Sequence, residues 1–136
     1  MGNPRSSLRP RRQVIVTPGG AYLFLARIYL DDGLTLLTPD LPRLVTLRVR
    51  SDYDGGVVRQ LPLRPDECLL DGLRTDDDWT WDTIGYQFRH RLFPDLISNP
   101  GVRYTVEYEF TLLGDTPEIP LYLHRETFSV LAGPAL

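Results

Sequence analysis

The chain contains no lysine, and its only thiol belongs to Cys68. A single cysteine excludes an intramolecular disulfide, and with it the class of small secreted domains that disulfides hold together. The absence of lysine places all fifteen basic charges on arginine. We attribute this bias to a GC-rich coding genome, although arginine also suits interfaces because its guanidinium binds carboxylates in bidentate fashion.

Long apolar runs are also missing. No stretch approaches the roughly 18 apolar residues of a membrane-spanning helix, and the N-terminus lacks the apolar run of a signal peptide. We therefore expect a protein that is made in the cytoplasm and has no membrane partner. No segment shows a convincing apolar period of 3.6 residues, so helix should be a minor part of the fold.

The sequence is instead rich in two-residue alternation, most clearly between residues 102 and 112. Every second residue there is apolar: Val102, Tyr104, Val106, Tyr108, Phe110 and Leu112. This period buries one face of a strand and leaves the other in water. Similar patterns occur at 21–30, 43–50 and 85–92, and twelve prolines and eleven glycines supply the turns between short strands. The pattern predicts an all-β, antiparallel sandwich of about seven to nine strands with Greek-key connections.

The chain divides into a short basic arm and one domain. Residues 1–12 include one leucine and two prolines and cannot bury a core, so we interpret them as a flexible or partner-ordered arm before a single sandwich domain at 13–136. The arm has a net charge of +4 and no acidic residue, whereas the domain holds eleven arginines against eighteen acids, a net charge of −7. The acidic domain should repel nucleic acid, and the arm should dock on an acidic neighbouring subunit. The interaction residues of the arm are Arg5, Arg9, Arg11 and Arg12.

No set of residues indicates catalysis. We assign neither His90 nor His124 a second metal ligand two or four residues further along the chain. We therefore expect both histidines to be structural. Cys68 lacks a helix start that would lower its pKa, so we expect a buried, inert thiol. No serine lies in a nucleophile-elbow context. We therefore predict no enzymatic activity, no cofactor and no small-molecule substrate.

The segment from 75 to 82 combines acidic and aromatic residues. Its four aspartates could chelate calcium, which prefers clustered oxygen ligands, but their spacing departs from the calcium-loop pattern. We expect them to solvate a turn and predict no metal site. They are Asp76, Asp77, Asp78 and Asp82.

Trp79 and Trp81 are two residues apart, so in an extended segment they share one face. They then either form an interface or ligand contact, since tryptophan is a frequent interface anchor, or cap one open end of the sandwich core. Both interpretations remain open at this stage.

Two parts of the chain resemble a known family. A turn at Pro100 and Gly101 precedes Tyr104, and this arrangement resembles the tyrosine corner of immunoglobulin-like sandwiches. We therefore expect the Tyr104 ring to be buried and its hydroxyl to bond a nearby backbone group. The final third resembles the closing hairpin of an immunoglobulin-like or fibronectin-III-like module. Residues 44–50 with the turn at 54–56 are similar to the central hairpin of immunoglobulin-like domains in tailed-phage virion proteins. The chain departs from fibronectin type III because its second predicted strand has no tryptophan.

The resemblance implies a non-enzymatic virion structural protein. Such a protein, a capsid-decoration, minor tail or baseplate component, would be made in the host cytoplasm and would dock to copies of itself or to capsid or tail proteins. The alternative is a small carbohydrate-binding or adhesin-like module that uses Trp79 and Trp81.

Overall fold

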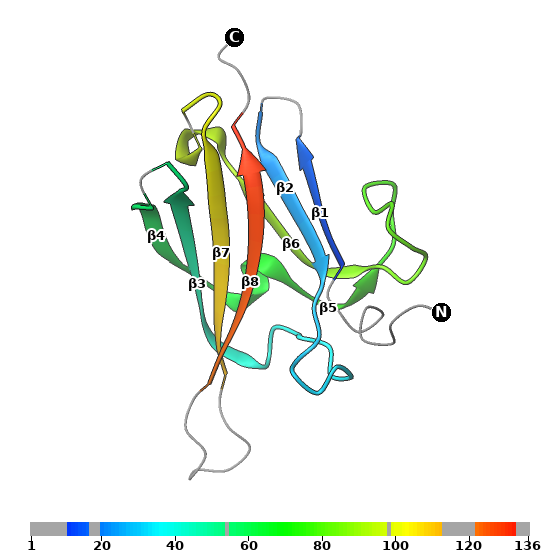
Figure 1. Cartoon of the computed structure of the whole chain (residues 1–136). Helices are drawn as coiled ribbons and strands as arrows, with labels where there is room; N and C mark the ends of the chain where they lie inside the picture. The colour runs from blue at the N-terminus through cyan, green and yellow to red at the C-terminus, as the bar shows by residue number, and fades with distance from the viewer. Residues whose placement is uncertain (1–10, 17–19, 54, 98, 113–121, 133–136) are drawn as a thin grey trace, which may run out of the picture.

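The computed structural model describes residues 11–16, 20–53, 55–97, 99–112 and 122–132. Two four-stranded antiparallel sheets pack face to face, as Figure 1 shows. This arrangement confirms the predicted all-β sandwich. No helix in these described ranges has the length and apolar character required to cross a membrane.

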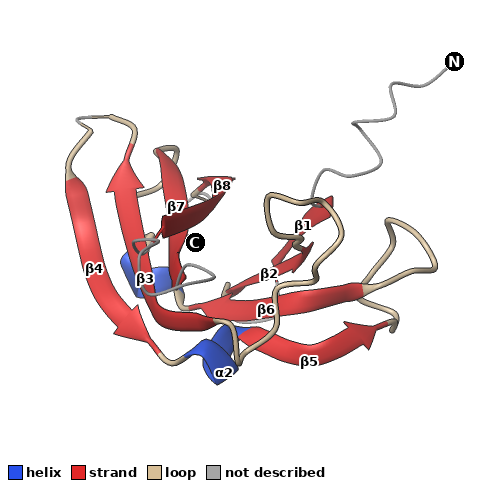
Figure 2. Ribbon diagram, turned by 90° about the horizontal axis from the view of Figure 1, so that it is seen from below, coloured by secondary structure: helices blue, strands red, loops and turns tan. Residues whose placement is uncertain are grey.

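The first sheet has the strand order β1-β2-β6-β5 and the second has the order β4-β3-β7-β8. The first sheet consists of β1 (Arg11–Val16), β2 (Tyr22–Arg27), β5 (Leu69–Arg74) and β6 (Tyr86–Leu92). The second consists of β3 (Pro42–Ser51), β4 (Val57–Leu63), β7 (Arg103–Leu112) and β8 (Tyr122–Leu131). Two short helices, α2 (Pro65–Cys68) and η1 (Pro94–Leu96), lie in connections. Figure 2 shows the two layers, with α2 between β4 of the second sheet and β5 of the first.

Aromatic rings fill the centre of the core. The ring centroids of Phe88 and Tyr108 are 4.7 Å apart, as are those of Phe24 and Phe128, so both sheets contribute to one packed group. Complete burial of one such side chain stabilises the fold by roughly 1.5–3 kcal/mol. The alternation in 102–112 is confirmed, since five of its six apolar residues are buried on β7.

The outer face of the second sheet is covered by ion pairs across three strands. Arg48 on β3 contacts Glu107 at 3.0 Å and Glu109 at 3.1 Å on β7, and Arg125 on β8 contacts Glu109 at 2.9 Å. The hydrogen bond from Arg48 is the main cause that holds the pKa of Glu109 below its usual value. Opposite charges on facing strands stabilise the strand register.

Tyr104 has the surroundings that its position after a Pro-Gly turn predicts. Its ring is buried, and its hydroxyl accepts a hydrogen bond of 3.2 Å from the backbone N–H of Asn99. Gly101 closes the turn with φ +77°, a conformation that favours glycine because other residues carry a Cβ. The expected burial and backbone contact of Tyr104 are therefore confirmed.

Gln87 differs from expectation, since alternation along β6 assigns it to the solvent side. It is fully buried because the segment 28–37 folds over it. Its amide nitrogen donates to the carbonyls of Ile28 at 2.6 Å and Leu37 at 3.0 Å, and its amide oxygen accepts from Ile28 N at 3.0 Å. Gln87 thus anchors the connection that leads from β2 to the second sheet.

The start of the domain also differs from expectation. The first strand begins at Arg11 and not at Gln13, so Arg11 and Arg12 belong to β1 rather than to an arm. Arg5 and Arg9 lie outside the described residues.

Candidate functional site

Asp82 organises the segment between β5 and β6. Four groups donate hydrogen bonds to its carboxylate at 2.9–3.1 Å: Trp79 Nε1, Arg27 Nη1, Ile84 N and Gly85 N. Burial by itself would raise the pKa of Asp82, but these hydrogen bonds hold it well below its usual value. Since the Arg27 side chain is almost fully buried, Asp82 also supplies the counter-charge that makes its burial tolerable.

Trp79 is a buried part of this segment. Only 5% of it is exposed, and it packs on the outer face of the first sheet against Leu23, Leu25 and Tyr86. Its ring centroid lies 5.6 Å from that of Tyr86. Trp79 therefore does not cap an end of the main core but lies in a second, smaller core.

Asp76 and Asp82 of the segment have separate structural partners. Asp76 accepts a hydrogen bond of 2.6 Å from the hydroxyl of Tyr86 and one of 3.1 Å from the backbone N–H of Asp78. Within the described ranges, no three acidic, histidine or cysteine side chains gather in a way that could hold a metal ion.

Trp81 differs from Trp79, because half of it is exposed. Its Nε1 donates a hydrogen bond to the backbone carbonyl of Arg12, at the start of β1. The neighbouring Gln13 secures the same segment, since its side-chain oxygen accepts from Thr80 N at 3.0 Å. The expectation that the two tryptophans share a face is wrong, because the segment turns instead of extending.

Arg12 pairs with an acid of its own domain. Its Nη2 lies 2.8 Å from Oε2 of Glu126, and its Nε lies 3.1 Å from the same oxygen. Glu126 is only 2% exposed and lies on β8, an edge strand of the second sheet, whereas β1 is an edge strand of the first. The pair therefore connects the two sheets at one open side of the sandwich. The charge of Arg12 is used within the domain, contrary to its predicted role in the arm.

His124 extends this cluster. Its Nε2 is 2.7 Å from Oε1 of Glu126, and its Nδ1 is 3.6 Å from Oδ1 of Asp31. The hydrogen bond with Glu126 is the largest influence and raises the pKa of His124 despite partial burial. Glu126 stands at i+2 from His124, so the sequence did contain a signal for this contact, and our assignment of no i+2 partner was wrong.

Cys68 belongs to the main core, and His90 packs against Tyr108. His90 Nδ1 is 2.7 Å from the hydroxyl of Tyr108, and burial lowers the pKa of His90 to about 4. Burial likewise raises the pKa of the Cys68 thiol to about 12, with smaller contributions from Glu67 and Asp66. The thiol is buried as predicted and remains protonated at neutral pH, which makes it a poor nucleophile.

The structure brings two predicted interaction residues together, Arg12 and Trp81. With Glu126 and His124 they form what we call the N-terminal corner, where the basic residues 1–10 join the domain. Comparison of this chain with family models, with curated proteins and with solved structures gave no match.

Proposed function

We propose that this chain is a non-enzymatic structural subunit of a virion that acts by docking to neighbouring subunits. The observation that carries the proposal is the N-terminal corner. A half-exposed Trp81 is held against the first strand directly beside the point where a basic segment joins the domain. Tryptophan and arginine are among the residues that contribute most often to the binding energy of interfaces.

The strand order supports the immunoglobulin-like resemblance on which the virion setting rests. In constant-type immunoglobulin domains, strands A, B, E and D form one sheet and strands C, F and G form the other. The orders β1-β2-β6-β5 and β4-β3-β7-β8 correspond to this pattern, with β4 as an additional strand beside C. The contact of Tyr104 with the backbone of Asn99 fits the tyrosine corner of the same family.

Charge indicates the nature of the partner. Arg5 and Arg9 lie in a segment, residues 1–10, that has no acidic residue, whereas the whole chain has a net charge of −3. Opposite charges favour and orient association, so a second copy of this acidic chain suits the segment. Capsid or tail proteins with an acidic surface would suit it in the same way.

The carbohydrate-binding alternative has less support. It requires two exposed tryptophans that act as a platform for a sugar ring, and only Trp81 is exposed. Trp79 is held inside the second core by its hydrogen bond of 2.9 Å to Asp82.

Native mass spectrometry of the full chain tests the proposal through self-association. We expect oligomers whose dissociation constant rises at least about tenfold, equivalent to about 1.4 kcal/mol, after Trp81→Ala or after deletion of residues 1–10. Tyr53→Ala is the matched control, because Tyr53 is an 88% exposed aromatic residue in the β3–β4 connection. A full chain that stays monomeric at every concentration, or equal effects of Trp81→Ala and Tyr53→Ala, would contradict self-docking through this corner.

A further inference from the structure

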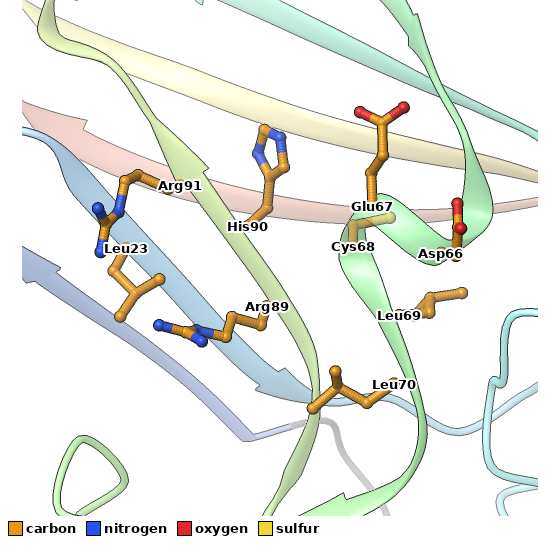
Figure 3. A pocket seen from close by; sticks show the side chains of 9 residues that line it. All are labelled: Leu23, Asp66, Glu67, Cys68, Leu69, Leu70, Arg89, His90 and Arg91. Carbon is orange, nitrogen blue, oxygen red and sulfur yellow. The ribbon is translucent and has the colours of Figure 1, made fainter.

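A cavity of about 300 Å³ lies beside β6, away from the N-terminal corner. Its walls come from α2, β5, β6 and Leu23 of β2, as Figure 3 shows. This volume is at the lower end of the range for small-molecule sites, about 300–1,000 Å³.

The cavity exists because β5 follows only part of β6. The two strands pair at Leu69–Phe88 and again at Arg74–Tyr86, so β5 bulges away between these positions. Beyond Phe88, β6 pairs with β2 on one side, and α2 rather than a strand lies on the other. Beside the second half of β6 the cavity is therefore bordered by the short helix instead of a paired strand, and it extends across β6 to Leu23 of β2.

Two arginines of β6 line this space. Arg89 and Arg91 are two residues apart and so lie on one face of the strand, with Cα atoms about 6.5–7 Å apart. They stand in register with Leu25 and Leu23 of β2. Figure 3 shows both side chains extending from β6 over β2, on the side where Leu23 lies.

Within the described residues, neither Arg89 nor Arg91 forms an ion pair with a carboxylate. The cavity does contain two acids, Asp66 and Glu67, but both lie beside Arg64, at 3.5 and 3.2 Å. Figure 3 places these acids on α2, across β6 from the arginine side chains. The guanidinium groups are therefore available to an external anion.

The chemistry of the walls specifies that anion further. Guanidinium groups bind the oxygens of phosphate through paired, charge-assisted hydrogen bonds. The buried Leu23 and the partly buried Leu70 provide apolar surface next to the arginines. We propose that the cavity binds a phosphomonoester, with the phosphate on Arg89 and Arg91 and the organic group against the leucines. This site is independent of the proposed docking function.

Calorimetric titration of the full chain with phenyl phosphate and with inorganic phosphate, at constant ionic strength, tests the proposal. We expect both probes to bind and phenyl phosphate to bind more tightly. The double variant Arg89→Gln, Arg91→Gln should weaken both at least tenfold, while Arg59→Gln, an exposed arginine on β4, should change neither. Leu70→Ala should weaken phenyl phosphate only.

Backbone amide shifts in the unaltered protein give a second measurement that does not depend on the fold of any variant. Phenyl phosphate should shift the amides of residues 66–70 and 89–91 and leave the N-terminal corner unchanged. Shifts elsewhere, an absence of binding, or equal loss of binding in Arg59→Gln would overturn the proposal. Equal affinity for the two probes would overturn the part of the proposal that places the organic group against the leucines.

Discussion

Arg12 donates both Nε and Nη2 to a single carboxylate oxygen of Glu126, at 3.1 and 2.8 Å. This contact joins residues that are 114 positions apart and connects edge strand β1 to edge strand β8. Because Glu126 is buried, its charge depends on Arg12 and His124 for compensation.

Arg12→Ala should lower the free energy of unfolding by about 2 kcal/mol. Loss of one partner from a fully buried pair costs about 3–5 kcal/mol, and we expect less here because the Arg12 side chain is 42% exposed. Urea denaturation measures the change. Arg64→Ala is the control, because both partners in its pairs are exposed and such pairs contribute about 0–1 kcal/mol. Similar losses in the two variants would contradict the special role of the Arg12–Glu126 pair.

Two deletions should have different effects on stability. Removal of residues 1–10 should leave the melting temperature of the monomer unchanged, measured below the dissociation constant of the oligomer, because β1 begins at Arg11. Removal of residues 1–12 takes away part of β1 and the partner of Glu126, and should lower the melting temperature by on the order of 5–10 °C. Calorimetry distinguishes the two outcomes. An equal melting temperature for both deletions would show that the start of β1 contributes nothing to the stability of the fold.

His124 should make stability depend on pH. Its pKa in the folded protein is raised above 6.5, chiefly by Glu126 and also by Asp31, with Arg12 as the cation on the other side of Glu126. The stabilisation is complete below about pH 6.5 and is lost as pH rises through the raised pKa, with a slope of up to about 1.4 kcal/mol per pH unit. The free energy of unfolding, measured from pH 5 to 9, should lose this slope in His124→Asn.

His90 should act in the opposite direction. Its pKa is lowered to about 4 in the folded protein, so the unfolded chain binds more protons between about pH 4 and 6.5. Stability should therefore fall as pH drops through that range. Burial against Tyr108 lowers the pKa of His90, and the charge of Glu67 opposes this shift. A pH profile that rises steadily toward pH 4 would contradict this assignment.

Tyr104→Phe should cost on the order of 1 kcal/mol, a typical net contribution of one hydrogen bond. The substitution keeps the buried ring and removes only the hydroxyl that accepts from Asn99 N. Tyr53→Phe in an exposed connection provides the control and should have no effect on chemical denaturation. If both variants unfold at the same denaturant concentration as the original protein, the hydrogen bond from Asn99 N to the Tyr104 hydroxyl does not stabilise the fold.

Millimolar calcium should leave the melting temperature unchanged. Asp76 and Asp82 already accept hydrogen bonds from the protein, and a bound ion would have to replace those donors. An ion that binds the folded state raises the melting temperature by mass action, so thermal denaturation with and without calcium measures it directly. A calcium-dependent rise would identify the segment as a metal site.

Alternation predicted the parts of the fold in which each strand buries one face. It located β7 and the burial of Tyr104, because their neighbours follow a strict period of two. It missed β5, where Leu69 and Leu70 are followed by Asp71 and Gly72 and the strand bulges from its neighbour. Gln87 was misplaced because its burial depends on a connection that folds back over it.

The candidate site was less accessible to sequence reasoning, because its contacts join distant residues. Asp82 neutralises Arg27 from 55 positions away, and nothing local to either residue indicates the other. Glu126 lies at an inward position of β8, where an acid is unexpected, and its partner Arg12 belongs to a strand of the other sheet. Pairings of this kind follow from how the sheets stack, which a one-dimensional pattern does not contain.

The Arg12–Glu126 pair also determines how the domain would carry mechanical load. If a neighbouring subunit held residues 1–10, tension would enter the domain at Arg11. Without a link to β8, only the pairing of β1 with β2 would resist that tension. The ion pair at the second residue of β1 instead transfers part of the tension to β8, and therefore to the second sheet. A pull at the N-terminus is thus resisted by both sheets from its first point of attachment.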